Sequence, residues 1–109
     1  MKIDFSAIPE TVMPQFWGGE GDTIARIFKD EKVKIMRGRL PAGAYIGLHT
    51  HETSCEVIYI VGGTGKVLYE GEYEPLSAGS CHYCPKGCAH SLINDSDGDL
   101  EFFAVVPEQ

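Results

Sequence analysis

Short apolar runs separated by turn-forming residues make up most of the chain, and the 3.6-residue periodicity of amphipathic helices is nearly absent. The runs are four to eight residues long, and clusters that contain Gly, Pro, Asn or Asp separate them. Strands of this length, joined at this spacing, predict an all-β sandwich or barrel. The predicted strands are residues 23–28, 33–40, 55–61, 66–70, 80–84, 90–93 and 100–106.

The 109-residue length predicts one domain spanning residues 1–109, with residues 1–22 as an N-terminal arm and residues 23–107 as the barrel. In the arm, Ser6 is expected to cap a single helical turn. The stretch MPQFWGGEG reads as a loop or an edge strand, because its proline cannot donate to a β-ladder. Within that stretch, the adjacent Phe16 and Trp17 are expected to cover one mouth of the barrel as a hydrophobic lid.

Composition and charge narrow the possible partners. A hydrophobic content of 43% and a charged content of 23% are those of an ordinary globular protein. The formal net charge of −7 argues against binding to a nucleic-acid backbone. The longest purely apolar runs are far shorter than the roughly 20 residues that cross a bilayer, so no membrane partner is expected. The first ten residues contain no apolar signal segment, which predicts a cytoplasmic protein with reduced cysteines.

Three potential metal ligands lie within eight positions of a chain that has four histidines in total. His49 and His51 are two residues apart, so in a strand both side chains point to the same face. After a short turn, Glu56 enters the next predicted strand. If that strand pairs with the first, its carboxylate faces the two imidazoles. His90, which follows the tight turn Pro85–Gly87, is the candidate for a fourth ligand.

Two nitrogens and an oxygen that converge in this way suit a borderline transition metal better than calcium, and they leave coordination positions open. Spacing alone leaves an alternative. In that alternative, His49 and His51 are surface residues at a strand end, and His90 is a hydrogen-bonded histidine of the core.

Two segments resemble the two signature motifs of the cupin superfamily, in order and without a gap inside either. The first is GAYIGLHTHETSCEVIYIVGG, which contains His49, His51 and Glu56. The second is GSCHYCPKGCAHSLIN, which contains the proline–glycine turn and His90. Only 15 residues, 64–78, separate the motifs. This short spacing resembles that of small single-domain bacterial cupins.

The resemblance implies a double-stranded β-helix, that is, a jelly-roll barrel of two facing antiparallel sheets. It also implies that His49, His51, Glu56 and His90 hold one divalent ion per chain, which could be iron, manganese, nickel, copper or zinc. Cupins pair sheets across a two-fold axis, and the last predicted strand, EFFAVV, is apolar on both faces. A homodimer is therefore expected, although the arm could instead cover the outer face of this strand.

The resemblance does not choose a reaction. Open coordination positions favour a metal-dependent enzyme that acts on a small polar organic molecule through oxygenase or enolate/isomerase-type chemistry. The alternative is a non-catalytic cupin that binds or senses a small sugar or carboxylate ligand. It is favoured by the small size of the chain, which leaves few residues to build a reaction centre. No catalytic residue is assigned.

Three of the four cysteines, Cys81, Cys84 and Cys88, lie in the second motif. Strand alternation puts Cys81 and Cys84 on opposite faces, which argues against a shared iron–sulfur or zinc site with Cys88. The same alternation pairs Cys81 with Tyr83 and His82 with Cys84. One pair is expected to face the cavity, and the sequence leaves open which pair does so.

Overall fold

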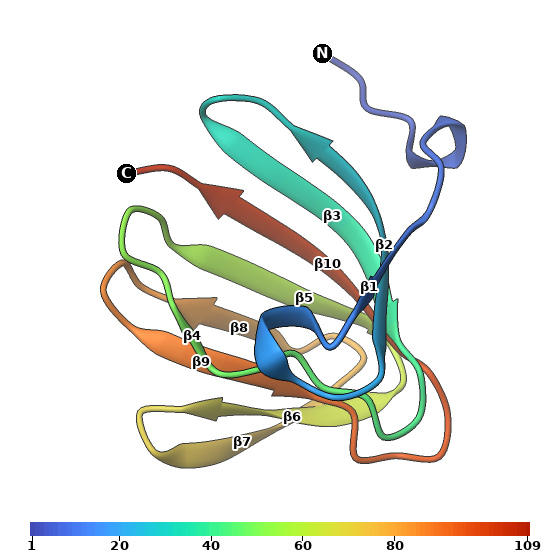
Figure 1. Cartoon of the computed structure of the whole chain (residues 1–109), viewed down its shortest axis with the longest axis vertical. Coiled ribbons are helices and arrows are strands. Elements are labelled where there is room, and N and C mark those ends of the chain that lie inside the picture. The colour runs from blue at the N-terminus through green and yellow to red at the C-terminus, as the bar shows by residue number, and fades with distance from the viewer.

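The computed structural model describes all 109 residues, which form two facing antiparallel β-sheets (Figure 1). The larger sheet has six strands in the order β1-β2-β3-β10-β5-β8, and the smaller has four in the order β4-β9-β6-β7. The strands are β1 (Thr11–Pro14), β2 (Asp22–Lys29), β3 (Val33–Leu40), β4 (His49–Thr50), β5 (Glu56–Gly62), β6 (Thr64–Tyr69), β7 (Glu72–Ser77), β8 (Cys81–Cys84), β9 (Ala89–Ile93) and β10 (Leu100–Pro107). The only helices are two three-residue 3-10 turns, η1 (Phe5–Ala7) and η2 (Phe16–Gly18), and neither is long and apolar enough to span a bilayer.

The path of the chain confirms the predicted double-stranded β-helix. From β3 onward the chain moves to the other sheet at every connection except the β6–β7 hairpin, which stays in the smaller sheet. The crossings wind the two sheets around a common interior. Sequence neighbours such as β4 and β5 therefore lie in opposite sheets, which decides how the metal-ligand candidates meet.

The predicted strands match observed strands to within two residues, but the list of predicted strands omitted the two-residue β4 and also β7. This strand contains Pro75, which is tolerated because β7 is the outer strand of the smaller sheet. In the arm, β1 is an edge strand that ends at Pro14. It includes the first two residues of the stretch MPQFWGGEG, for which a loop or an edge strand was expected. The prediction of a helical turn capped by Ser6 is wrong. The observed turn η1 starts earlier because the Asp4 carboxylate accepts the Ser6 backbone N–H at 3.1 Å.

The core lies between the two sheets, and alternate residues of each strand supply it. In β10, Phe102, Ala104 and Val106 are buried on the inner face, as the alternation of the sequence predicts. On the outer face, Phe103 meets the ring of Phe5 from the arm edge-on, with 6.1 Å between ring centroids. The arm therefore covers part of the outer face of this strand.

Candidate metal centre

The predicted ligands come from both sheets. His49 on β4 is the direct cross-strand partner of His90 on β9, so these two imidazoles lie side by side in the smaller sheet. His51 follows one residue after the end of β4. Glu56 is the first residue of β5 in the larger sheet and faces the histidines across the barrel. The expectation that the strand of Glu56 pairs with the strand of the two histidines is wrong, because residues 51–55 carry the chain from one sheet to the other.

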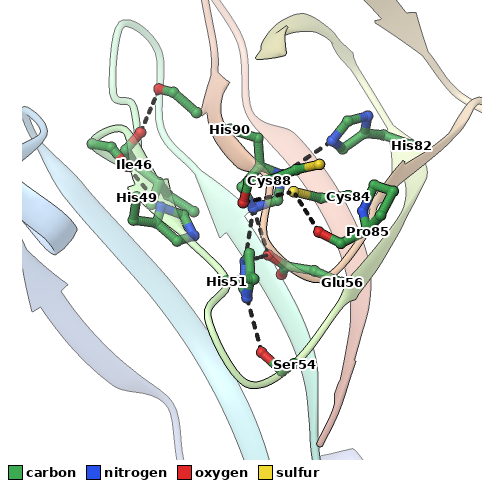
Figure 2. A network of polar contacts seen from close by, with 12 residues as sticks. Ile46, His49, His51, Ser54, Glu56, His82, Cys84, Pro85, Cys88 and His90 are labelled. Atoms are coloured by element: carbon green, nitrogen blue, oxygen red, sulfur yellow. Dashed lines mark hydrogen bonds and ion pairs between the residues drawn. The ribbon is translucent and has the colours of Figure 1, made fainter. Parts of the chain in front are cut away.

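The four side chains converge on one point (Figure 2). His51 Nε2 and His90 Nε2 lie 3.0 Å and 2.8 Å from the same Glu56 oxygen, Oε1, and 3.0 Å from each other. His49 completes the group, whose ligand atoms all lie within 4.8 Å of one another. Metal–ligand distances of about 2.1 Å place ligands at right angles about 3.0 Å apart. The spacing and the chemistry of these donors therefore fit a divalent transition metal.

The tight turn before His90 also fixes His51. Gly87 has φ +89°, which a residue with a side chain rarely adopts, and the Cys88 N–H donates to the Pro85 carbonyl at 3.1 Å. The Gly87 N–H donates to the His51 carbonyl at 2.7 Å, and the His51 N–H donates to the Cys88 carbonyl at 3.0 Å. One turn thus positions the backbone of two candidate ligands that are 39 residues apart in the sequence.

Hydrogen bonds on the far side of each ring leave the Nε2 atoms directed at the centre. His49 Nδ1 lies 2.8 Å from the Gly47 carbonyl, which can only accept, so this nitrogen carries the proton. His51 Nδ1 lies 3.1 Å from the Ser54 hydroxyl. Partners of this kind orient metal-binding imidazoles and fix their tautomers.

The electrostatics favour an anionic carboxylate beside neutral imidazole. Burial alone would raise the pKa of Glu56, but hydrogen bonds from His51 and His90 outweigh it and lower this pKa to about 2. Burial lowers the pKa of His49 below its usual value, which keeps its ring neutral at pH 7. Neutral imidazole and ionised carboxylate are the forms that bind metal.

The centre lies in a cavity of about 300 Å³ whose other walls include Met36, Ile58 and Phe102. Phe16 and Trp17, the residues expected to form a lid, also line this cavity, and Trp17 is 59% exposed. The indole of Trp17 stacks on the ring of His49 with 5.1 Å between centroids and an interplanar angle of 9°. The lid therefore touches a candidate ligand directly.

Lys34 also lines the cavity, although the sequence pattern did not single it out. Burial is the main cause that lowers its pKa, while the nearby Glu56 charge raises it. The available signal was alternation, since Lys34 lies two residues before the buried Met36 and so shares its face. Lys34 is the only lysine or arginine among the cavity residues.

The structure answers which pair on β8 faces inward. His82 and Cys84 are buried, whereas Cys81 and Tyr83 are exposed, so Cys81 and Cys84 do lie on opposite faces. A second group of potential ligands, His82, Cys84 and His90, shares His90 with the first. Burial raises the pKa of the Cys84 thiol to about 12, which keeps it protonated in the metal-free protein.

Comparison with known proteins agrees with this geometry. A family model described as a cupin domain matches residues 36–106. The chain belongs to the cupin family. A curated relative from Thermotoga maritima, named oxalate-binding protein, is 36% identical over 97% of this chain and 93% of its own length.

Solved structures share the same fold. A predicted oxalate decarboxylase from Thermotoga maritima has a TM-score of 0.93 and 30% identity, with both chains covered completely. A polyketide cyclase from Streptomyces resistomycificus has a TM-score of 0.81 at 17% identity and covers 98% of this cupin and 78% of its own chain. The second likeness extends to the fold alone.

Replacing His51 or His90 with alanine is expected to lower bound metal to well under half of wild type, because each change removes one donor from the group. Bound Co²⁺ can be measured by elemental analysis after gel filtration. Titrations can follow the fluorescence of Trp17, the only tryptophan, which lies against His49. Thr50→Ala is the control, since Thr50 is exposed on the same strand. Full metal retention by both histidine variants, with the β-sheet circular dichroism spectrum intact, would rule out these ligands.

Proposed function

We propose that this cupin binds one divalent transition metal through His49, His51, Glu56 and His90 and uses it to bind oxalate or a similarly small dicarboxylate. The supporting observation is that the donor group lies in a small cavity that also contains one partly buried cation, Lys34. The metal would supply open coordination positions for carboxylate oxygens. Three nitrogens and one carboxylate suit iron, manganese, nickel, copper or zinc.

Charge balance supports a dianionic ligand. A divalent ion beside the Glu56 carboxylate leaves a net charge of +1, and Lys34 adds a second positive charge. A dicarboxylate neutralises both in one binding event. The chain as a whole carries −7, and Glu52 and Glu108 also line the cavity, so the positive charge is confined to the metal and Lys34.

The comparison with the Thermotoga maritima relative supports the same ligand class. That protein is named for oxalate binding, and its 36% identity covers nearly the whole of both chains. The cavity of about 300 Å³ is at the lower end of typical small-molecule pockets. Its volume accommodates a ligand as small as oxalate.

A second candidate is the metal-dependent enzyme, with decarboxylation of the bound ligand as the reaction. The name of the solved Thermotoga maritima structure, a predicted oxalate decarboxylase, points to it. Loss of carbon dioxide leaves a carbon that must receive a proton. Glu52 and Glu108 line the cavity and are exposed at its rim, where a carboxyl group can exchange protons with water. Binding is the favoured function because the buried walls around the donor group are mostly apolar.

Oxalate is expected to bind the Mn²⁺-loaded protein at least tenfold more tightly than acetate does, because only the dianion matches both positive charges. Isothermal titration calorimetry measures both affinities, and elemental analysis afterwards checks that oxalate has not extracted the metal. The metal-free protein is the control and should bind oxalate much more weakly. Equal binding with and without metal would contradict the proposal. Formate produced during a prolonged incubation with oxalate would establish the decarboxylase instead.

Substituting Lys34 with glutamine is expected to weaken oxalate binding about tenfold, or about 1.4 kcal/mol, through the loss of one partly buried positive charge. Acetate binding should change less, since one carboxylate is already neutralised at the metal. Lys32→Gln is a matched control because it removes the same charge from an exposed position two residues away. If both variants bind oxalate as wild type does, Lys34 has no part in recognition.

We also propose that the protein is a cytoplasmic homodimer. All four cysteines are free, which agrees with a reducing compartment. The outer face of the larger sheet exposes Tyr59, Val61 and Tyr83 by 46%, 43% and 54%. Tyr59 lies between Phe103 and Cys81 in the strand register, so these residues extend the apolar surface left uncovered by the arm.

Light scattering is expected to give twice the chain mass of 11.9 kDa for wild type, because pairing would bury these side chains. Tyr59→Lys should shift the protein toward the monomer mass by placing a charge in the interface. Tyr73→Lys is the control, because Tyr73 is 61% exposed on the other sheet. A wild-type mass of 11.9 kDa at micromolar concentration would contradict the dimer.

A further inference from the structure

A chain of hydrogen bonds leads from the proposed metal centre to the protein surface. His90 Nδ1 lies 3.0 Å from His82 Nε2, and His82 Nδ1 lies 3.2 Å from Glu74 Oε1. His90 and His82 are 1% and 4% exposed, whereas the side chain of Glu74 is 49% exposed. The three residues come from β9, β8 and β7, and Figure 2 shows His82 on the side of His90 away from His51.

We infer that Glu74 and His82 are positioning residues that hold His90 in its metal-binding tautomer and thereby raise metal affinity. The inference rests on the proposed metal centre. It extends that centre to two residues that would not bind the metal themselves but act through His90. Neither residue lines the cavity, so neither can contact a ligand bound there.

When His90 binds metal through Nε2, only one arrangement of protons lets every contact in this hydrogen-bond chain have a donor and an acceptor. The lone pair of Nε2 is then used, so the ring proton must be on Nδ1, which donates to His82 Nε2. His82 must in turn carry its proton on Nδ1 and donate it to the Glu74 carboxylate. Because a carboxylate can only accept, Glu74 selects this direction of the hydrogen-bond chain once a metal has replaced the proton between His90 and Glu56.

The opposite direction is unfavourable for the same reason. If His82 Nε2 donated to His90 Nδ1, a bare nitrogen of His82 would face the Glu74 carboxylate at 3.2 Å, and His90 Nε2 would carry a proton. That tautomer of His90 cannot bind metal. Glu74 therefore disfavours the form of His90 that competes with metal binding.

When both imidazoles are neutral and no metal is bound, one contact of this hydrogen-bond chain lacks a hydrogen. Three contacts lie along the chain: Glu56 with His90 Nε2, His90 with His82, and His82 with Glu74. Each contact needs one hydrogen, and two neutral imidazoles supply two. A metal ion at His90 Nε2 replaces the missing hydrogen between His90 and Glu56, so with both rings neutral all three contacts are satisfied only when the cation is bound.

The inference predicts that Glu74→Gln weakens Co²⁺ binding several-fold, because an amide can also donate and no longer fixes the direction of the chain. Glu72→Gln is the matched control, since it removes the same charge from an exposed position on the same face of β7. Chelator competition gives the dissociation constant, and the visible d–d spectrum of bound Co²⁺ reports the ligand field of His90. The spectrum should shift in Glu74→Gln and not in Glu72→Gln.

Two changes at His82 separate positioning from packing. His82→Leu removes the acceptor for His90 and is expected to weaken Co²⁺ binding by about 10- to 100-fold. His82→Gln can restore an acceptor oxygen and should recover much of this affinity. A purely structural His82 would lower the melting temperature of the metal-free protein in both variants without this order of affinities.

The outcomes distinguish this inference from the proposed metal centre. If wild type fails to bind Co²⁺, the metal centre is wrong and the inference falls with it. If wild type binds Co²⁺ and Glu74→Gln matches Glu72→Gln in affinity and spectrum, the centre stands and the inference is wrong. Glu74 is half exposed, so this variant remains decisive even if the His82 variants do not fold.

Discussion

The burial of one carboxylate is the constraint on which this structure depends. Glu56 is 6% exposed between two sheets that otherwise supply an apolar core. An ionised carboxylate in such a place is costly unless partners compensate its charge. Here the compensation comes from His51 and His90, whose ring nitrogens both contact the same carboxylate oxygen. A divalent cation placed between them would balance the charge more completely than neutral imidazoles can.

The topology makes this convergence possible. The double-stranded β-helix sends successive strands to opposite sheets, so residues that are close in sequence face each other across the interior. Glu56 and the histidine pair reach one point because residues 51–55 cross between the sheets. The turn at Pro85–Gly87 bonds to the backbone of His51 and also precedes His90. The donor group is thus held by backbone hydrogen bonds as well as by its own side chains, which limits how far it can rearrange when metal is absent.

Much of the fold could be predicted from the sequence because alternation and turn residues are local signals. The register of β10, with Phe102 inward and Phe103 outward, follows from period two alone. The pairing of strands does not follow from period two. The expectation that Glu56 lies on a strand beside that of His49 was therefore wrong. Local patterns also gave no reason to prefer His82 over Tyr83 as the inward residue. That choice depends on the register of β8 against β5, which opposes His82 to the buried Ile58.

The site was predictable to a similar extent. The four side chains that the structure brings together could be named from the motifs, and their role as metal ligands stays a prediction, but the groups around them could not be named. Lys34 shares the inward face of β3 with Met36, yet a lysine at the second position of a strand is more often solvated, so alternation alone did not indicate a role. The contact between Glu74 and His82 joins the edge strands of the two sheets and exists only once the barrel has closed.

Anomalous X-ray scattering from crystals grown with Co²⁺ tests the central claim most directly, because it locates the metal independently of activity. Data collected on both sides of the cobalt absorption edge should show one peak per chain, bounded by the Nε2 atoms of His49, His51 and His90 and by the Glu56 carboxylate. A peak between His82 and Cys84, or no peak at the Glu56 carboxylate in protein that retains cobalt, would contradict the account.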